Sequence, residues 1–191
     1  MARFDATIAA LGLALAWAGL VPAAQGAERG LNYIVPVAAG STDVPANRQQ
    51  MPDVLFADGS SLLVHLNRYR GAVVLVNFWS PLVPASVKEM LFLDRLQGDM
   101  LVQKEPLLVV PVNEDQGGIP GAKAFFAHQK ITFLKPAADP GGAMAQALAV
   151  RGLPSSILID KHGRVVTSVE GPYEWDSPVI VARIRQVMAE P

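Results

Sequence analysis

The sequence of 191 residues contains no cysteine. Disulfide bonds, catalytic thiolates, zinc–thiolate sites, iron–sulfur clusters and thioether-linked haem all require cysteine, so the sequence excludes each of them. The fold must therefore be held together by packing, without covalent cross-links between side chains. Any function of the protein must also work without a thiol of its own.

Charged residues are scarce as well, and their signs are nearly balanced. They make up 17% of the chain, with 16 Lys and Arg against 17 Asp and Glu. Nucleic-acid-binding domains carry a clear basic excess, so we expect no nucleic-acid partner. The three histidines, His65, His128 and His162, lie far apart without the short spacing of paired metal ligands. We therefore expect no metal site and no cofactor.

The N-terminal residues have the pattern of a targeting segment. Arg3 precedes an uncharged, largely apolar stretch over residues 6–25, which ends in small residues. The pattern predicts a signal peptide over residues 1–26, with an uncleaved membrane anchor as the alternative. Either way we expect the protein in the periplasm or another extracytoplasmic space. Only the uncleaved anchor would attach it to the inner membrane.

The remaining residues divide into a linker arm and one domain. Residues 27–50 contain scattered Gly, Pro, Ser and Asn without periodicity, which is typical of a linker. With 51% hydrophobic residues in the chain, residues 51–191 can form one core. Their pattern predicts an N-terminal β-hairpin (54–56 with 62–64), buried strands (72–79, 106–112), helices (83–96, 119–129, 142–150 and one from Ser177), an edge strand (133–134) and a second hairpin (156–160 with 165–169).

The helix predicted over residues 83–96 is amphipathic. Its apolar positions recur at helical spacing and define the expected inner face, while most polar positions lie opposite and are expected to face solvent. The apolar set is Val83, Val87, Met90, Leu91, Leu93 and Leu96, and the polar set is Ser86, Lys88, Glu89, Asp94 and Arg95.

Four segments in matching order resemble one family. They are VVLVNFW at 73–79 followed by KEM at 88–90, VRGLPSS at 150–156, IDKHGRV at 159–165, and EWDSP at 174–178. These segments resemble the TlpA/ResA-like (DsbE-type) periplasmic thioredoxin-fold family. The resemblance implies an α/β three-layer sandwich, with a central mixed sheet of four to five strands, helices on both faces and an N-terminal β-hairpin. It also places Leu153 and Pro154 in the family's cis-proline loop.

The chain departs from this family at its reactive centre. Members carry Cys-x-x-Cys after the Asn-Phe-Trp strand, and those two positions fall on Val83 and Ser86. Thiol–disulfide exchange needs one thiolate to attack and a second thiol to resolve the mixed disulfide. A serine hydroxyl would need an adjacent base, and the flanking Pro84, Ala85 and Val87 supply none. We therefore predict no catalytic residue.

What remains of the family's site is a surface. The resemblance implies that the cis-proline loop presents backbone groups to an extended partner segment. Here Leu153 and Pro154 would face Trp79, Ser80, Pro81, Leu82 and Val83, which are apolar except for Ser80. The partner would be an extended peptide or a segment of an exported protein, and the family's role in cytochrome c and oxidase assembly suggests maturation of such proteins.

Other interpretations of the same residues stay open. The positions around the lost cysteines could simply repack into the core, with Trp79 as a packing residue. The chain could also remain a thiol–disulfide oxidoreductase family member that acts only through a partner's thiols, or that is grouped there by homology alone. Asn113-Glu114-Asp115 ends a strand, where either acid could replace the family's acidic residue or form a capping turn. Asp176 and Ser177 are expected to cap the last helix.

Overall fold

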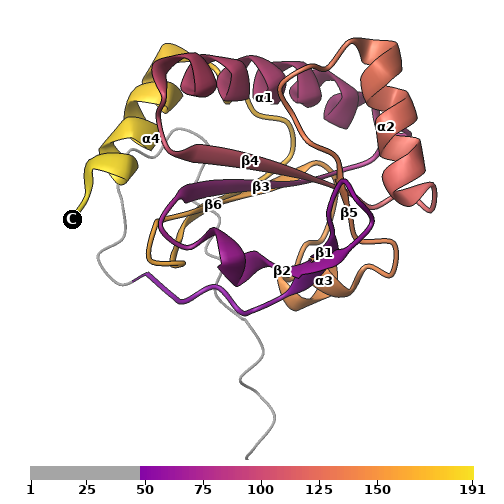
Figure 1. The fold of residues 1–191 in the computed structure, drawn as a ribbon, viewed down its shortest axis with the longest axis horizontal. Coiled ribbons are helices and arrows are strands. Elements are labelled where there is room, and N and C mark those ends of the chain that lie inside the picture. The colour runs from indigo at the N-terminus through magenta and orange to yellow at the C-terminus, as the bar shows by residue number, and fades with distance from the viewer. Residues whose placement is uncertain (1–47) are drawn as a thin grey trace, which may run out of the picture. The chain divides into compact units, whose positions relative to one another are not determined.

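A computed structural model describes residues 48–191 (Figure 1). The predicted signal peptide and all but the last three residues of the predicted linker arm lie outside the described residues. Within residues 48–191, no helix combines the length and the apolar character needed to cross a membrane.

The described chain folds around one mixed sheet of seven strands, in the order β2-β1-β5-β4-β3-β6-β7. The prediction of a thioredoxin-like α/β fold is confirmed, but the strand number of four to five was too low. The sheet is larger because the N-terminal hairpin joins it through a single pair, Ala57 with Ala138. The strands are β1 (Leu55–Ala57), β2 (Leu63–His65), β3 (Val73–Trp79), β4 (Leu107–Asn113), β5 (Ala137–Ala138), β6 (Ser155–Ile159) and β7 (Val165–Glu170).

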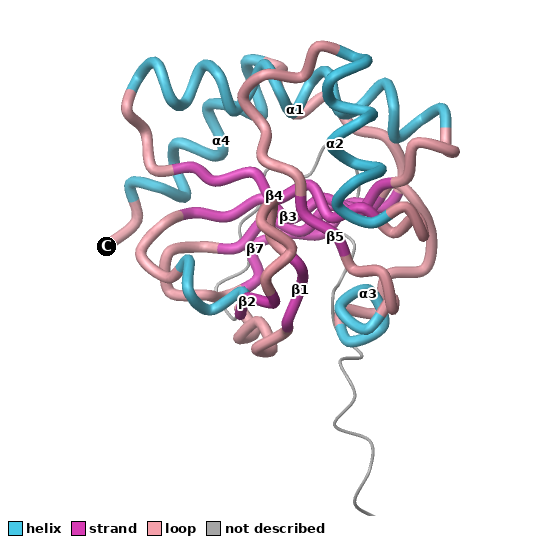
Figure 2. Tube along the Cα trace, turned by 45° about the vertical axis from the view of Figure 1, so that its right-hand side comes forward, coloured by secondary structure: helices cyan, strands magenta, loops and turns pink. Residues whose placement is uncertain are grey.

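Helices cover both faces of the sheet (Figure 2). One face packs against the long helices, with Trp79, Met90, Phe126 and Ile184 in its core. The other face packs against the hairpin and two short helices, with Phe56 in its core. The helices are α1 (Pro84–Gln103), α2 (Gly118–Gln129) and α4 (Pro178–Ala189) on the first face, and the 3-10 helix η1 (Leu66–Tyr69) and α3 (Ala143–Ala147) on the second.

Strand β3 is central, and all seven of its residues are buried. It pairs in parallel with β4 and antiparallel with β6. Burial on both faces explains why its sequence is an almost unbroken apolar run. No strand forms at 133–134, where an edge strand was predicted, because the carboxylate of Asp94 accepts the backbone N–H groups of Phe133 and Leu134. The strand forms a few residues later, as β5.

Helix α1 is longer than predicted and is rotated relative to its expected inner face. It continues to Gln103, and Ser86 and Glu89 are buried, whereas Leu91 is 40% exposed. The prediction that both polar residues face solvent was wrong. Positions 86, 89, 93, 96 and 100 recur every three or four residues, so they share one face of a helix. Glu89 is accommodated on that face because it finds polar partners there, whereas the Ser86 hydroxyl has none among the described residues.

The end of the predicted linker arm packs against the domain. Arg48 donates to Asp160 at 2.9 Å and to both carboxylate oxygens of Glu190 at 2.6 and 2.7 Å. The backbone N–H of Met51 donates to the carbonyl of Gly163 at 2.8 Å. These contacts tie the start of the described chain to the β6–β7 turn and the end of α4.

The observed register of α1 can be tested by truncating two neighbouring leucines. Leu93→Ala removes a fully buried side chain and is expected to lower the free energy of unfolding by about 2–5 kcal/mol. Leu91→Ala, on the half-exposed side, should cost about 1 kcal/mol or less. Urea unfolding of both variants measures the difference. Equal losses would contradict this register.

Candidate functional site

The positions of the lost cysteines lie where β3 runs into α1. Phe78 pairs with Ser155 in the sheet, so the next residues, Trp79 and Ser80, lie beside Pro154 and Leu153. The Leu153–Pro154 peptide bond is cis. The Oγ of Ser80 accepts the N–H of Leu82 at 3.1 Å, and its carbonyl accepts the N–H of Val83 at 3.2 Å. This turn delivers Val83 to the N-cap of α1.

The predicted binding residues divide into a buried and an accessible group. Trp79 is fully buried, with ring centroids 4.8 Å from Phe125 and 5.7 Å from Phe126. Ser80 and Pro154 are buried as well. Leu82 is 79% exposed, and three neighbours are partly exposed. We call this accessible group the rim: Pro81, Leu82, Val83 and Leu153.

Ser86 is buried in the first turn of α1. Its hydroxyl oxygen has no hydrogen-bond partner among the described residues. A serine nucleophile needs a base within hydrogen-bonding reach. The geometry therefore gives Ser86 no activation, in agreement with the flanking sequence.

The carboxyl group of Glu89 is the centre of a buried polar cluster on the next turn of α1. Its Oε1 accepts the indole N–H of Trp175 at 2.8 Å, and its Oε2 accepts the amide of Asn77 at 3.2 Å. The same amide nitrogen donates to the hydroxyl of Ser156 at 2.8 Å. The backbone of Tyr173 also bonds to Glu89. The cluster thus joins α1, β3, β6 and the loop before α4.

Burial raises the pKa of Glu89 to about 7, because the loss of solvent outweighs the hydrogen bonds from Trp175 and Asn77. This cluster was not predicted from the sequence. Glu89 was predicted on the solvent face, and Trp175 entered only as part of the EWDSP segment that resembles the family. The available signal was the spacing of Ser86, Glu89 and Leu93, which puts a carboxyl on an apolar helix face.

The two acids after β4 have separate roles. Asp115 accepts the backbone N–H of Gly117 at 2.8 Å, which is the turn expected before α2. Glu114 is partly buried, and one of its oxygens has no partner among residues 48–191. Its burial, helped by the nearby charge of Asp139, raises its pKa to about 7.

The expected cap of the last helix is absent. Asp176 instead accepts a 2.7 Å bond from Arg95, and the Ser177 side chain makes no capping bond. The N-terminal turn of α4 is entered through Pro178, which needs no N–H partner. In the described part of the chain, no three His, Asp or Glu side chains are grouped so that they could hold a metal ion.

The chain is similar to several known proteins. The Redoxin family profile matches residues 46–184. The chain is 26% identical over 123 residues to the thiol-disulfide oxidoreductase ResA of Bacillus thuringiensis subsp. konkukian, covering 64% of this chain and 69% of that protein. It is 29% identical over 124 residues to the thiol:disulfide interchange protein HelX of Rhodobacter capsulatus, covering 62% of each.

A solved structure supports the same grouping. The chain superposes on a DsbE-type thiol:disulfide interchange protein of Chlorobium tepidum with a TM-score of 0.65 and 25% sequence identity. The match covers 78% of this chain and all of the other. The fold of this chain is therefore shared with a protein that is named for thiol:disulfide interchange.

The buried carboxyl of Glu89 predicts a pH-dependent stability. The folded state keeps the Glu89 proton up to about pH 7, whereas the unfolded chain loses it near pH 4.5. The resulting stabilisation is complete below pH 4.5 and is lost as the pH rises through 7, a change of roughly 3 kcal/mol. Urea unfolding between pH 5 and 8 should therefore show a stability that falls with pH.

Glu89→Gln should remove the part of this slope that Glu89 contributes, and Glu114→Gln the part that Glu114 contributes, because burial raises the pKa of both carboxyls to about 7. Glu170→Gln, at an exposed position, is the control for replacing a glutamate by glutamine. A Glu89→Gln profile as steep as that of the unaltered protein would show that Glu89 does not titrate as described.

Proposed function

The chain belongs to the Redoxin family, and we propose that within it this protein is a redox-inactive, thioredoxin-like module that binds an extended segment of a partner protein. The proposal starts from the chemistry. Disulfide exchange requires two thiols in one site, and Val83 and Ser86 stand at those positions. The scaffold around them is complete, from the N-cap of α1 to the buried cluster at Glu89. A scaffold that lacks the two thiols can still present a binding surface.

The exposure of Leu82 is the observation that carries the proposal. A leucine that is 79% exposed at the start of a buried helix gains little from folding, and it is flanked by the apolar Pro81 and Val83. Contiguous apolar surface of this kind is typical of contact sites. The rim differs in this respect from the buried Trp79 beside it.

Leu153 supplies the second part of the proposed contact. Neither its N–H nor its carbonyl has a partner among the described residues. Free backbone groups beside an apolar side chain suit an extended peptide, which adds main-chain hydrogen bonds and places alternate side chains on the rim. The rim is therefore proposed to bind an unfolded or extended segment.

The nature of the partner follows from where the chain is expected to be. The N-terminal pattern favours export, so the partner would be an exported protein or a peptide outside the cytoplasm. The resemblance to proteins of cytochrome c and oxidase assembly makes a maturing protein of that kind the proposed client. The competing interpretation is an oxidoreductase that works through a partner's thiols.

Insulin reduction with dithiothreitol tests whether the chain carries out disulfide exchange by itself. The purified protein should give a trace identical to buffer. Val83→Cys with Ser86→Cys should accelerate insulin precipitation, because the new pair sits at a helix N-terminus that lowers the first thiol's pKa. Ser86→Cys alone is the control, since it lacks a partner thiol. Turnover by the unaltered protein would overturn the redox-inactive assignment.

Photocrosslinking tests the rim directly. A photoreactive amino acid at position 82 should capture partner proteins in cells. The matched control is position 102, because Val102 has the same 79% exposure and lies near the other end of α1. Crosslinks that are equal in amount and identity at both positions, or found only at 102, would remove the rim as the binding surface.

A further inference from the structure

The sheet has a gap beside the first half of β4. Strand β5 pairs only with Val112 and Asn113, and β1 meets β5 through one residue pair. Among residues 48–191, the part of β4 before Val112 therefore has no strand neighbour on that side. A cavity of about 500 Å³ occupies this gap, lined by β4, the β1–β2 hairpin, η1, α2 and the loop before β5.

The unpaired edge of β4 cannot form a ladder of hydrogen bonds with an added strand. The side chain of Gln97, from α1, accepts the N–H of Val109 at 2.7 Å and donates to the carbonyl of Leu107 at 3.3 Å. The next edge-facing position along the strand is Pro111, which has no N–H to offer. An added peptide strand would find these groups taken or missing, so the cavity suits a small molecule better than a peptide.

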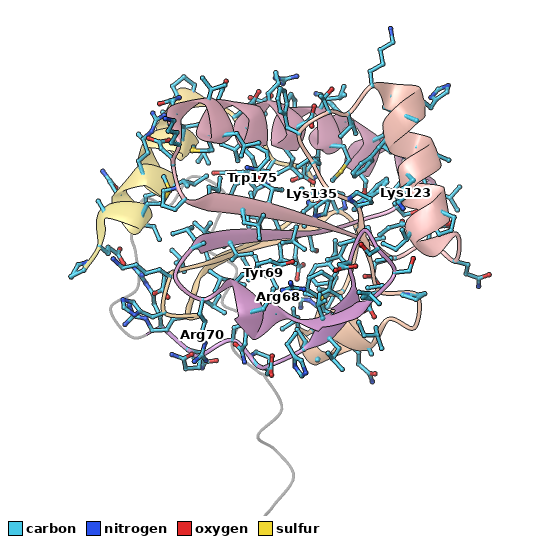
Figure 3. The ribbon with its side chains drawn as sticks, in the orientation of Figure 1. Arg68, Tyr69, Arg70, Lys123, Lys135 and Trp175 are labelled. Carbon is cyan, nitrogen blue, oxygen red and sulfur yellow. The ribbon has the colours of Figure 1, made fainter. Side chains whose placement is uncertain are left out.

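Cations outnumber acids around the cavity. Arg68, Lys123 and Lys135 all line it, and Figure 3 shows them on three separate elements. The one acid in the lining is Asp58, and its Oδ1 already accepts the backbone N–H groups of Ser60 and Leu62 at 2.8 and 3.2 Å. Arg68 lies 3.9 Å from the other oxygen of Asp58.

Both lysines lack a counter-charge. Within residues 48–191, no carboxylate lies within 4 Å of the amino group of Lys123 or Lys135. Three cations on one cavity against a single acid, Asp58, leave a net positive potential that attracts an anion.

The cavity also has an apolar wall. The rings of Phe56 and Tyr69 stack at a centroid distance of 6.3 Å, and the guanidinium of Arg68 lies 5.6 Å from the centre of the Tyr69 ring. Leu108 and Pro136 extend this wall. Apolar surface with a few converging polar groups is the usual make-up of a small-molecule site, and 500 Å³ lies within the usual size range.

We propose that this cavity binds a small amphipathic organic anion. Its carboxylate, phosphate or sulfonate group would lie toward Lys123 and Lys135, and its apolar body against Phe56 and Tyr69. The site is distinct from the rim. The cavity lies beside the first half of β4, whereas the rim follows the C-terminal end of β3, which runs parallel to β4. The inference therefore stands or fails independently of the proposed peptide binding.

The test uses 8-anilinonaphthalene-1-sulfonate, an aromatic anion whose fluorescence rises on binding. The purified protein should bind it saturably with one site. Lys123→Gln with Lys135→Gln should weaken that binding at least tenfold. The control pair, Lys88→Gln with Lys104→Gln, removes the same charge from exposed lysines outside the cavity and should change the affinity less than twofold.

Two further probes separate charge from apolar contact. The neutral N-phenyl-1-naphthylamine should bind both double variants alike, and inorganic phosphate should compete far more weakly than the aromatic sulfonate. Equal affinity of the sulfonate for both double variants would overturn the proposal. The proposal would also be overturned if Lys123→Gln with Lys135→Gln lost binding of the neutral probe, or if phosphate bound as tightly as the aromatic sulfonate. Loss of sulfonate fluorescence in Leu82→Ser would likewise overturn it, because the probe would then bind at the rim.

Discussion

The hydrogen-bonded carboxyl of Glu89 is the interaction on which the rest of this domain depends. A carboxyl on the inner face of α1 is costly to bury, and donors from Trp175, Asn77 and the backbone of Tyr173 offset part of that cost. Because these donors come from β3 and the loop before α4, the cluster sets how α1 sits on the sheet. The rim inherits its shape from that arrangement, since Leu82 and Val83 lead directly into α1.

The chain keeps the fold although it lacks the thiols needed for the thiol–disulfide exchange that its relatives' names describe. Val83 occupies the N-cap position of α1, Ser86 lies in its first turn, and the Leu153–Pro154 loop adjoins the end of β3. Fold and function are separable because packing stabilises the scaffold, while two thiols would have supplied the reaction. The two surfaces proposed for binding arise differently. The rim occupies the position of the lost reactive centre, and the cation-lined cavity exists because β5 is too short to cover β4.

Burial decided which elements were predictable. Strand β3 is buried on both faces, so its apolar run was visible, and the βαβ order followed from it. The register of α1 was not visible in this way, because polar residues on a buried face cannot be distinguished from polar residues in solvent without their partners. Strand β5 has only two residues, too few for any periodicity, and the expected strand at 133–134 became a loop held by Asp94. The hairpin was predicted, but its union with the main sheet was not.

The sequence alone determined that this protein has no thiol chemistry, that its domain is α/β with a thioredoxin-like order of elements, and which residues replace the reactive pair. The first is a property of composition, and the other two follow from the resemblance of four segments to a known family. Tertiary structure decided that Glu89 and Trp175 form a buried pair, that Trp79 is enclosed while Leu82 is exposed, and that three cations meet at one gap in the sheet. Each of these depends on contacts between residues far apart in the chain, and no local pattern specifies such contacts.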